Sequence, residues 1–301
     1  IATAGFKPGE EYRKPTGISP ADISRLRDWL KTQPHLPADH ITDLDLMLAY
    51  HCCGRSSEVT KQLLDLNCTL RTLFTGFFKD RVLEPRIYQV MDLVLITILP
   101  QRTKEGYAVF YVTFLDKDPK KFSFPDACRT GLMNLDIWQR MEGTWPGFVI
   151  IFDLERMSLG HMAKLDVQHM QQYLYYLQEG MFVNLKGMHF SNAPSFMDRL
   201  MLLLRPFLKK PLLEILHIHQ VGSKTLNQFV SMENLPIDAG GTGDTFKELR
   251  EDMIKKMNDN KKYFEAENLR RVDEKLRPGK PKTISDIFGS VEGSFKKLEI
   301  D

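Results

Sequence analysis

Paired cysteines, an excess of charge and long apolar runs are all missing from this 301-residue chain. Its four cysteines, Cys52, Cys53, Cys68 and Cys128, lack the spacing of disulfide scaffolds or zinc motifs, so we expect reduced thiols. The 41 basic and 39 acidic residues leave a net charge of +2, which argues against nucleic-acid binding. No apolar run reaches the roughly 20 residues of a membrane-spanning helix. The first residues also lack the pattern of a signal peptide, which predicts a cytoplasmic protein.

Motifs of nucleotide binding and of nucleophilic catalysis are missing as well. The glycine-rich segment 240–243 has no following Lys-Ser/Thr and does not open a βαβ unit, so it is interpreted as a turn. The chain contains no G-x-S-x-G sequence. Asp153 and Glu155 follow an apolar run, where we assign them structural roles. The sequence therefore predicts no enzymatic activity, no catalytic residue and no cofactor.

One stretch, from Asn192 to Lys210, has far more apolar surface than a surface helix needs. Pro194 suits the first turn of a helix, where its missing N–H has no cost. Two neighbouring stripes follow at helical spacing: Phe196, Leu200, Leu203 and Phe207, and beside them Met197, Met201, Leu204 and Leu208. An ordinary surface helix shows a single apolar stripe about 100° wide. We therefore expect this helix to cover an apolar interior and to meet a second apolar surface on its outer side.

The front quarter of the chain is typical of helices. Ser19 followed by Pro20 is a helix start with a capping residue and proline at the first position. We expect helices over about 20–32, 42–52 and 57–73. The glycines and prolines of residues 1–18 predict an extended arm before them.

After Pro85, short β-branched and aromatic runs alternate with helical segments. The expected strands are 94–99, 108–114, 148–154, 185–190 and 213–219. The expected helices are 126–142, 166–179 and 194–210, then a charged helical region at 244–277 and a tail packed through Phe288, Phe295 and Leu298. This alternation predicts an α/β fold with a largely parallel sheet and helical crossovers.

Five ordered motifs in this framework resemble the CRAL-TRIO (Sec14-like) lipid-binding family, in the branch of α-tocopherol transfer protein and cellular retinaldehyde-binding protein. They are Val149–Glu155, Lys186–Pro194, Arg205–Leu208, His217–His219 and Leu235–Gly241. The resemblance implies an N-terminal helical domain at 19–84 and a lipid-binding domain at 85–245. The arm 1–18 precedes them, and a helical extension with a tail follows at 246–301. The resemblance also implies an apolar cavity whose floor is the sheet and which a mobile gate helix closes. The gate of the family corresponds to residues 194–210 of this chain.

The resemblance to tocopherol-transfer relatives also implies a set of ligand-binding residues. The set is Thr130, Asn134, Phe148, Phe152, Tyr173, Leu177, Met181, Val183 and Met188, with Phe196, Leu200, Leu203 and Leu204 from the gate. Segment 166–188 interleaves aromatic residues with methionines, which suits a wall that adapts to its ligand. We expect Thr130 and Asn134, one helical turn apart, to offer the ligand its few polar contacts.

A basic cleft that captures phosphoinositide head groups is a second feature of the family. Lys186, Arg205, Lys209 and Lys210 are the basic residues that match it here. The helix that reads Leu-Arg-Ala-Arg in relatives is Tyr50–Cys53 in this chain, without arginine. We therefore expect general attraction to an anionic membrane, with a solvated basic helix end as the alternative.

Three histidines raise the alternative of a metal site. His217 and His219 alternate on an expected strand and so share one face, and His189 on a neighbouring strand could complete a zinc site. The family has the same His-x-His pair without a metal, and no acidic general base stands at a suggestive spacing. We therefore predict no metal.

Two functions remain open at this point. The first is a monomeric, non-catalytic, intracellular carrier of a tocopherol-like or other isoprenoid ligand, such as a retinoid or carotenoid, which it exchanges at membranes. Such a protein would be cytoplasmic and reversibly membrane-associated. The alternative is a membrane-recruited interaction module that responds to phosphoinositides or phospholipids and has little carrier activity.

Overall fold

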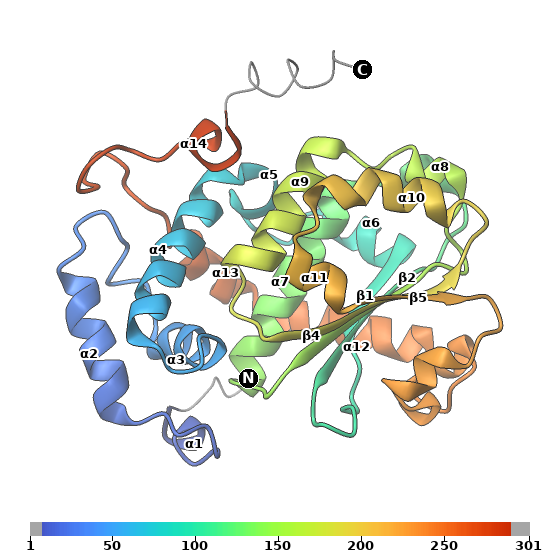
Figure 1. Cartoon of the computed structure of the whole chain (residues 1–301), viewed down its shortest axis with the longest axis horizontal. Helices are drawn as coiled ribbons and strands as arrows, with labels where there is room; N and C mark the ends of the chain where they lie inside the picture. Colours follow the sequence, from blue (N-terminus) through green and yellow to red (C-terminus); the bar gives the residue numbers. More distant parts are fainter. Residues whose placement is uncertain (1–7, 290–301) are drawn as a thin grey trace.

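A five-stranded sheet forms the centre of the computed structural model, which describes residues 8–289 (Figure 1). The strands are β1 (Val94–Ile98), β2 (Ala108–Phe114), β3 (Phe148–Asp153), β4 (Leu185–Ala193) and β5 (Leu216–Gln220). They stand in sequence order, with β1 and β2 antiparallel and every later pair parallel. Parallel neighbours need a crossover between them, and helices supply it here. The predicted α/β fold with a largely parallel sheet is confirmed.

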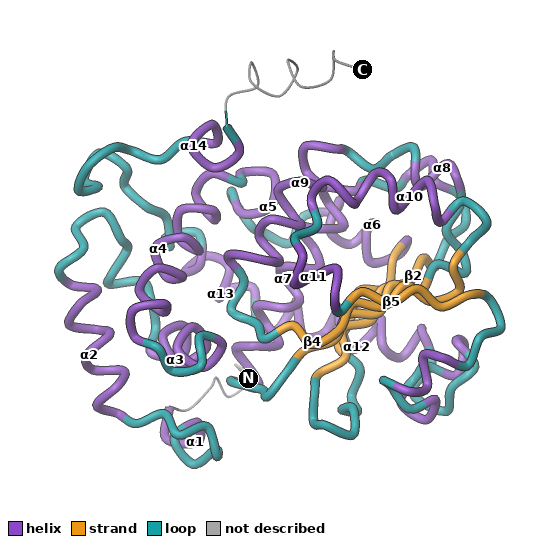
Figure 2. The backbone as a smooth tube through the Cα atoms, viewed as in Figure 1, coloured by secondary structure: helices purple, strands orange, loops and turns teal. Residues whose placement is uncertain are grey.

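Helices precede the sheet and cover both of its faces. Those before the sheet are α1 (Pro8–Glu11), α2 (Pro20–Lys31), α3 (Asp43–Cys52), α4 (Ser57–Leu73), α5 (Thr75–Phe78) and α6 (Pro85–Leu93). Those after β2 are α7 (Phe124–Glu142), α8 (Leu159–Met162), α9 (Val167–Tyr175), α10 (Met197–Leu204), α11 (Lys210–Glu214), α12 (Phe246–Asp259), α13 (Lys261–Glu267) and α14 (Ile284–Phe288). Figure 2 shows the strands as one narrow band with helices on either side. Helices α7, α9 and α10 lie over one face, and α12 lies over the other (Figure 1).

Local sequence signals explain where the front helices begin. The Ser19 and Thr42 hydroxyls each accept a hydrogen bond from the backbone of the third helical residue, and Asp22 and Asp45 bond back to the caps. Each exchange satisfies backbone N–H groups that a helix start leaves free. The helices expected at 20–32, 42–52 and 57–73 are therefore confirmed to within about a residue.

The expected helix at 194–210 is wrong in length. Strand β4 continues to Ala193, and α10 begins only at Met197. The helix ends at Leu204, and Arg205–Phe207 forms a 3-10 turn. Pro206 explains this end, because proline has no N–H for the helical ladder and its ring clashes with the preceding turn. The expected strand at 213–219 is shifted for a similar reason, since residues 210–214 form α11 with Pro211 at its start.

Other expected boundaries also move. Helix α9 ends at Tyr175, and a π-helical turn, η2 (Tyr176–Gly180), continues it. The charged helical region stops at Glu267 instead of reaching 277. Within the expected arm, residues 8–11 form α1, whose Glu11 is buried and accepts a hydrogen bond from the Thr144 N–H. In the tail, Phe288 stacks on Phe74 with ring centroids 5.8 Å apart, whereas Phe295 and Leu298 lie outside the described residues.

A buried ion cluster joins the N-terminal helices to α7 and α13. Asp136 of α7 accepts a bidentate pair of hydrogen bonds from Arg71 at 2.9 and 3.0 Å and a 2.6 Å bond from Arg81. Glu267 of α13 pairs with the same two arginines. Side chains of Arg81 and Glu267 are fully buried, so their charges are stabilised by one another rather than by water.

Candidate functional site

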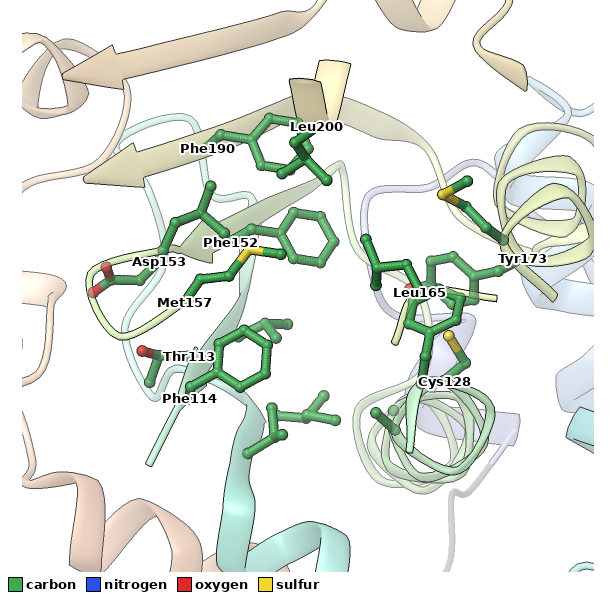
Figure 3. A pocket seen from close by; sticks show the side chains of 18 of the residues that line it. Thr113, Phe114, Cys128, Phe152, Asp153, Met157, Leu165, Tyr173, Phe190 and Leu200 are labelled. Atoms are coloured by element: carbon green, nitrogen blue, oxygen red, sulfur yellow. The ribbon is translucent and has the colours of Figure 1, made fainter. Parts of the chain in front are cut away.

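An apolar cavity lies between the sheet and helices α7, α9 and α10 (Figure 3). About 1040 Å³ of space, open solvent included, lies between its lining atoms. Pockets that bind small molecules are lined mostly by apolar side chains. The cavity therefore has the lining of a site for an apolar ligand.

The sheet forms the floor of the cavity. Residues two apart on a strand share a face. The inward-facing side chains are Val94 and Ile96 on β1, Phe110, Val112 and Phe114 on β2, Phe152 on β3, and Met188 and Phe190 on β4. The register places Phe152 beside both Val112 and Phe190, and the Phe152 and Phe190 rings stack at 5.3 Å. Hydrocarbon thus covers the floor continuously across the middle strands.

Helices and connecting segments form the walls. Their contributions are Phe122, Phe124, Cys128, Met157, Leu165, Met170, Tyr173 and Leu174. Burial raises the pKa of the Cys128 thiol well above its usual value and also raises the pKa of the Tyr173 hydroxyl. Both groups are therefore uncharged at neutral pH. The walls present neutral groups and almost no polarity.

Helix α10, called the gate from here on, covers the cavity from above the sheet. Leu200 and Leu204, one helical turn apart, line the cavity together with Leu208 beyond the helix end. Leu202 is about 200° around the helix from Leu200, so it points outward and is 72% exposed. Leu202 belongs to neither of the stripes expected from the sequence. Its neighbours on the outer face, Asp198, Arg199 and Arg205, are exposed as well.

The cavity lining brings together part of the expected ligand-binding set. Phe152, Tyr173, Met188, Leu200 and Leu204 all line it. They come from β3, α9, β4 and the gate, so segments far apart in the sequence meet here.

Other members of the expected set lie outside the lining. The Thr130 hydroxyl donates to the Asp126 carbonyl at 2.8 Å, and Asn134 Nδ2 donates to the Ile96 carbonyl at 2.6 Å. Both side chains are thus hydrogen-bonded within the protein, away from the cavity lining. Phe148 and Val183 line a separate small hollow beside Trp145.

The remaining expected residues belong to the surrounding core. Leu177 is buried within η2, and Met181 is buried just after it. Phe196 and Leu203 flank the inward face of the gate and are half-buried without lining the cavity. Successive residues of a helix point about 100° apart, so the neighbour of a cavity-facing residue packs beside the cavity instead of lining it.

Several lining residues were not in the expected set. Phe190 could have been identified from the sequence, because strand alternation puts it on the same face as Met188. Phe110, Val112 and Phe114 alternate in the same way on β2. Met157 and Leu165 lie in connecting segments without periodicity, and no sequence signal identifies them.

The four expected basic residues do not form a single cluster of free charges. Lys209 Nζ pairs with Glu179 Oε1 at 2.7 Å, and Lys210 Nζ lies 4.0 Å from Glu214 Oε1. Arg205 is exposed at the end of the gate. Lys186 stands at the start of β4, where its stem lies beside Gly147.

The three histidines come together on the sheet face away from the cavity. His189 Nδ1 lies 3.1 Å from His219 Nε2, and the His189 and His217 rings stack at 5.1 Å. Burial, with smaller effects of His219 and His217, lowers the pKa of His189 to about 3. Among residues 8–289, no group of three or more His, Cys, Asp or Glu side chains could hold a metal ion.

The described part of the chain contains no helix with the length and apolar character needed to cross a membrane.

Comparisons with known proteins identify the segment that builds this site. The model of the CRAL/TRIO domain family matches residues 94–241, and that of the Pinta-like UBA domain matches residues 19–86. Clavesin-1 of Rattus norvegicus is 25% identical over 223 residues, which are 73% of this chain and 63% of clavesin-1. Clavesin-2 of Homo sapiens is 27% identical over 232 residues, 73% of this chain and 68% of clavesin-2. The chain thus spans less than two thirds of the length of clavesin-1.

Among solved structures, the crystal structure of Sfh5 aligns with 94% of this chain and 99% of its own, at 11% identity and a TM-score of 0.43. The CRAL/TRIO match, unlike this structural similarity, is a match of the amino-acid sequence over one continuous segment. That segment contains every strand of the sheet, the cavity floor and the gate. Residues 94–241 therefore form a CRAL/TRIO domain.

Proposed function

We propose that this chain is a non-catalytic carrier that encloses one hydrophobic lipid and exchanges it at membrane surfaces. The observation that supports this most directly is the cavity, whose floor, walls and gate are almost entirely hydrocarbon. Burial of apolar surface contributes about 25 cal/mol per Å², so a long hydrocarbon ligand gains its affinity from contact with these walls. Membership of the CRAL/TRIO family, whose members bind and transfer lipids, supports the same function.

The ligand we propose is an isoprenoid of tocopherol-like character, with a retinoid or carotenoid as the alternative. The branch of α-tocopherol transfer protein and cellular retinaldehyde-binding protein is the part of the family whose motifs the sequence resembles. The mixture of phenylalanine and methionine around the cavity supports a flexible, partly unsaturated ligand, because such side chains adapt to irregular shapes.

Exchange is proposed to take place when the outer face of the gate meets a membrane. Leu202 is the most exposed apolar residue of the gate, and Arg199 and Arg205 flank it. Each basic residue near an anionic surface adds about 1 kcal/mol of attraction. We propose that the protein is cytoplasmic, monomeric and only reversibly membrane-associated.

Extraction of the purified protein with organic solvent, followed by mass spectrometry, tests the carrier function. We expect a single co-purifying neutral lipid, together with saturable uptake of tocopherol or retinol by the emptied protein. A protein that carries no lipid, and that takes up neither these compounds nor phospholipid, would contradict the proposal. Vesicle binding without lipid uptake would favour the membrane-recruited interaction module instead.

A further inference from the structure

Among residues 8–289, Tyr173 carries the only oxygen-bearing side-chain group that faces the cavity. Two other lining residues carry oxygen, Thr113 on β2 and Asp153 on β3. Each stands next to an inward-facing phenylalanine, so strand alternation turns its side chain to the other face of the sheet. Figure 3 shows the Thr113 hydroxyl and the Asp153 carboxylate pointing away from the cavity.

Both oxygens of the Asp153 carboxylate are also held by protein donors. The carboxylate accepts hydrogen bonds from the Tyr111 hydroxyl, from Asn192 Nδ2 at 2.8 Å and from the Glu155 N–H at 3.1 Å. Asp153 is therefore bonded within the protein on the side away from the cavity.

Tyr173, by contrast, has no hydrogen-bond partner for its hydroxyl among residues 8–289. Its ring is held in place edge-on by Phe77, with centroids 6.3 Å apart, so the position of the hydroxyl is defined by packing. The neighbouring Cys128 offers only a thiol, which is a weak donor. A hydroxyl that faces an apolar cavity without a protein partner is free to bond a ligand that brings a matching polar atom.

Within the described part of the chain, no lysine, arginine or histidine lines the cavity. An enclosed phosphate or carboxylate would therefore lose its hydration without gaining a counter-charge, which is strongly unfavourable. Because the lining offers no cationic side chain, a ligand whose anionic group would lie inside the cavity is excluded.

We infer that Tyr173 binds the single polar group of an uncharged lipid and so fixes which end of the ligand enters the cavity first. This inference rests on the proposed carrier function. The polar end lies between α7 and α9, beside Cys128, and the hydrocarbon extends over Phe152 and Phe190 toward Leu200 (Figure 3). The ligand class is an uncharged long-chain lipid with one hydroxyl or carbonyl group.

Three C20 compounds with one skeleton test this inference: phytane, phytol and phytanic acid. Binding to the emptied full-length protein is measured at pH 8 by displacement of a fluorescent lipid. We expect the wild type to bind phytol about three- to tenfold tighter than phytane, the range of one net hydrogen bond, and phytanate more weakly than either. Tyr173→Phe should weaken phytol binding by the same factor and leave phytane binding unchanged.

Tyr175→Phe is the matched control, because Tyr175 is on α9 but outside the cavity lining and packs against Phe288. Equal phytol binding by Tyr173→Phe and wild type would overturn the role of Tyr173, and phytanate binding as tight as phytol binding would overturn the exclusion of charged lipids. In either case phytane uptake would leave the carrier function intact. If the wild type bound none of the three compounds, both the inference and the carrier function would fail.

Discussion

Gln178 Oε1 accepts a hydrogen bond of 2.8 Å from the backbone N–H of Lys209, just beyond the end of the gate. Gln178 Nε2 donates at the same time to the Phe207 carbonyl at 2.9 Å. Between these two positions stands Leu208, which lines the cavity. The π-helical turn η2 therefore restrains the segment through which the gate would have to hinge.

The first prediction is that Gln178→Ala speeds ligand release. Two neutral hydrogen bonds of about 1 kcal/mol each restrain the closed segment, so we expect release to accelerate about fivefold or more. Stopped-flow transfer of a fluorescent lipid to acceptor vesicles measures this rate. Gln171→Ala, on α9 and without a hydrogen bond to the gate among residues 8–289, is the control. Equal rates for both variants would show that the gate does not hinge here.

The second prediction separates ligand binding from membrane contact. Leu202→Asp places a charge on a side chain that is 72% exposed, so folding and ligand affinity should remain within error of wild type. Binding to anionic vesicles and lipid transfer should fall severalfold, because a carboxylate cannot enter the apolar part of the membrane. Val59→Asp, at another exposed apolar position, should change neither. Transfer unaffected by Leu202→Asp would mean that another surface meets the membrane.

The third prediction is that a double change on the inner face of the gate prevents lipid uptake itself. Leu200→Asp with Leu204→Asp introduces carboxylates into the apolar cavity, where they would be desolvated. We expect lipid uptake and transfer to be abolished while the protein remains soluble, as measured by uptake in solution and by circular dichroism. Normal uptake by this variant would show that these leucines are not a lid over the ligand.

The buried ion cluster should control stability. Asp136→Asn removes one of the two carboxylates that Arg71 and Arg81 share, Glu267 being the other, and removal of one member of a buried ion pair costs about 3–5 kcal/mol. Urea unfolding measures the loss. Asp252→Asn, which breaks an exposed pair with Lys256, should cost no more than about 1 kcal/mol. A similar cost for the two variants would mean that the cluster is solvated.

Acid should destabilise the protein through His189. The pKa of this imidazole in the folded protein is about 3, below its ordinary value of about 6.5, so the folded state favours the neutral form. The associated stability is complete above pH ~6.5 and is lost as the pH falls toward 3, by up to about 1.4 kcal/mol per pH unit. His189→Gln should flatten the decline in unfolding free energy between pH 7 and 5, whereas His40→Gln, at an exposed position, should not. Parallel curves for wild type and His189→Gln would contradict this pH dependence.

The sequence alone determined the order of the five strands and of most of the longer helices. Capping residues such as Ser19 and Thr42 act within one helical turn, and apolar alternation along β2 or β4 repeats every second residue. Both are local signals that depend only on nearby residues. Together with ordered motifs, they were enough to predict the α/β fold and to identify the gate region.

Tertiary structure alone decided which side chains face the cavity. Thr130 and Asn134 have polar groups suited to a ligand. Thr130 instead bonds the preceding turn of its own helix, and Asn134 bonds the distant strand β1. Leu202 became the outward residue of the gate only because Leu200 and Leu204 were drawn toward the cavity. The orientation of a helix and the partners of a buried polar group depend on packing between distant segments, and local sequence does not contain that information.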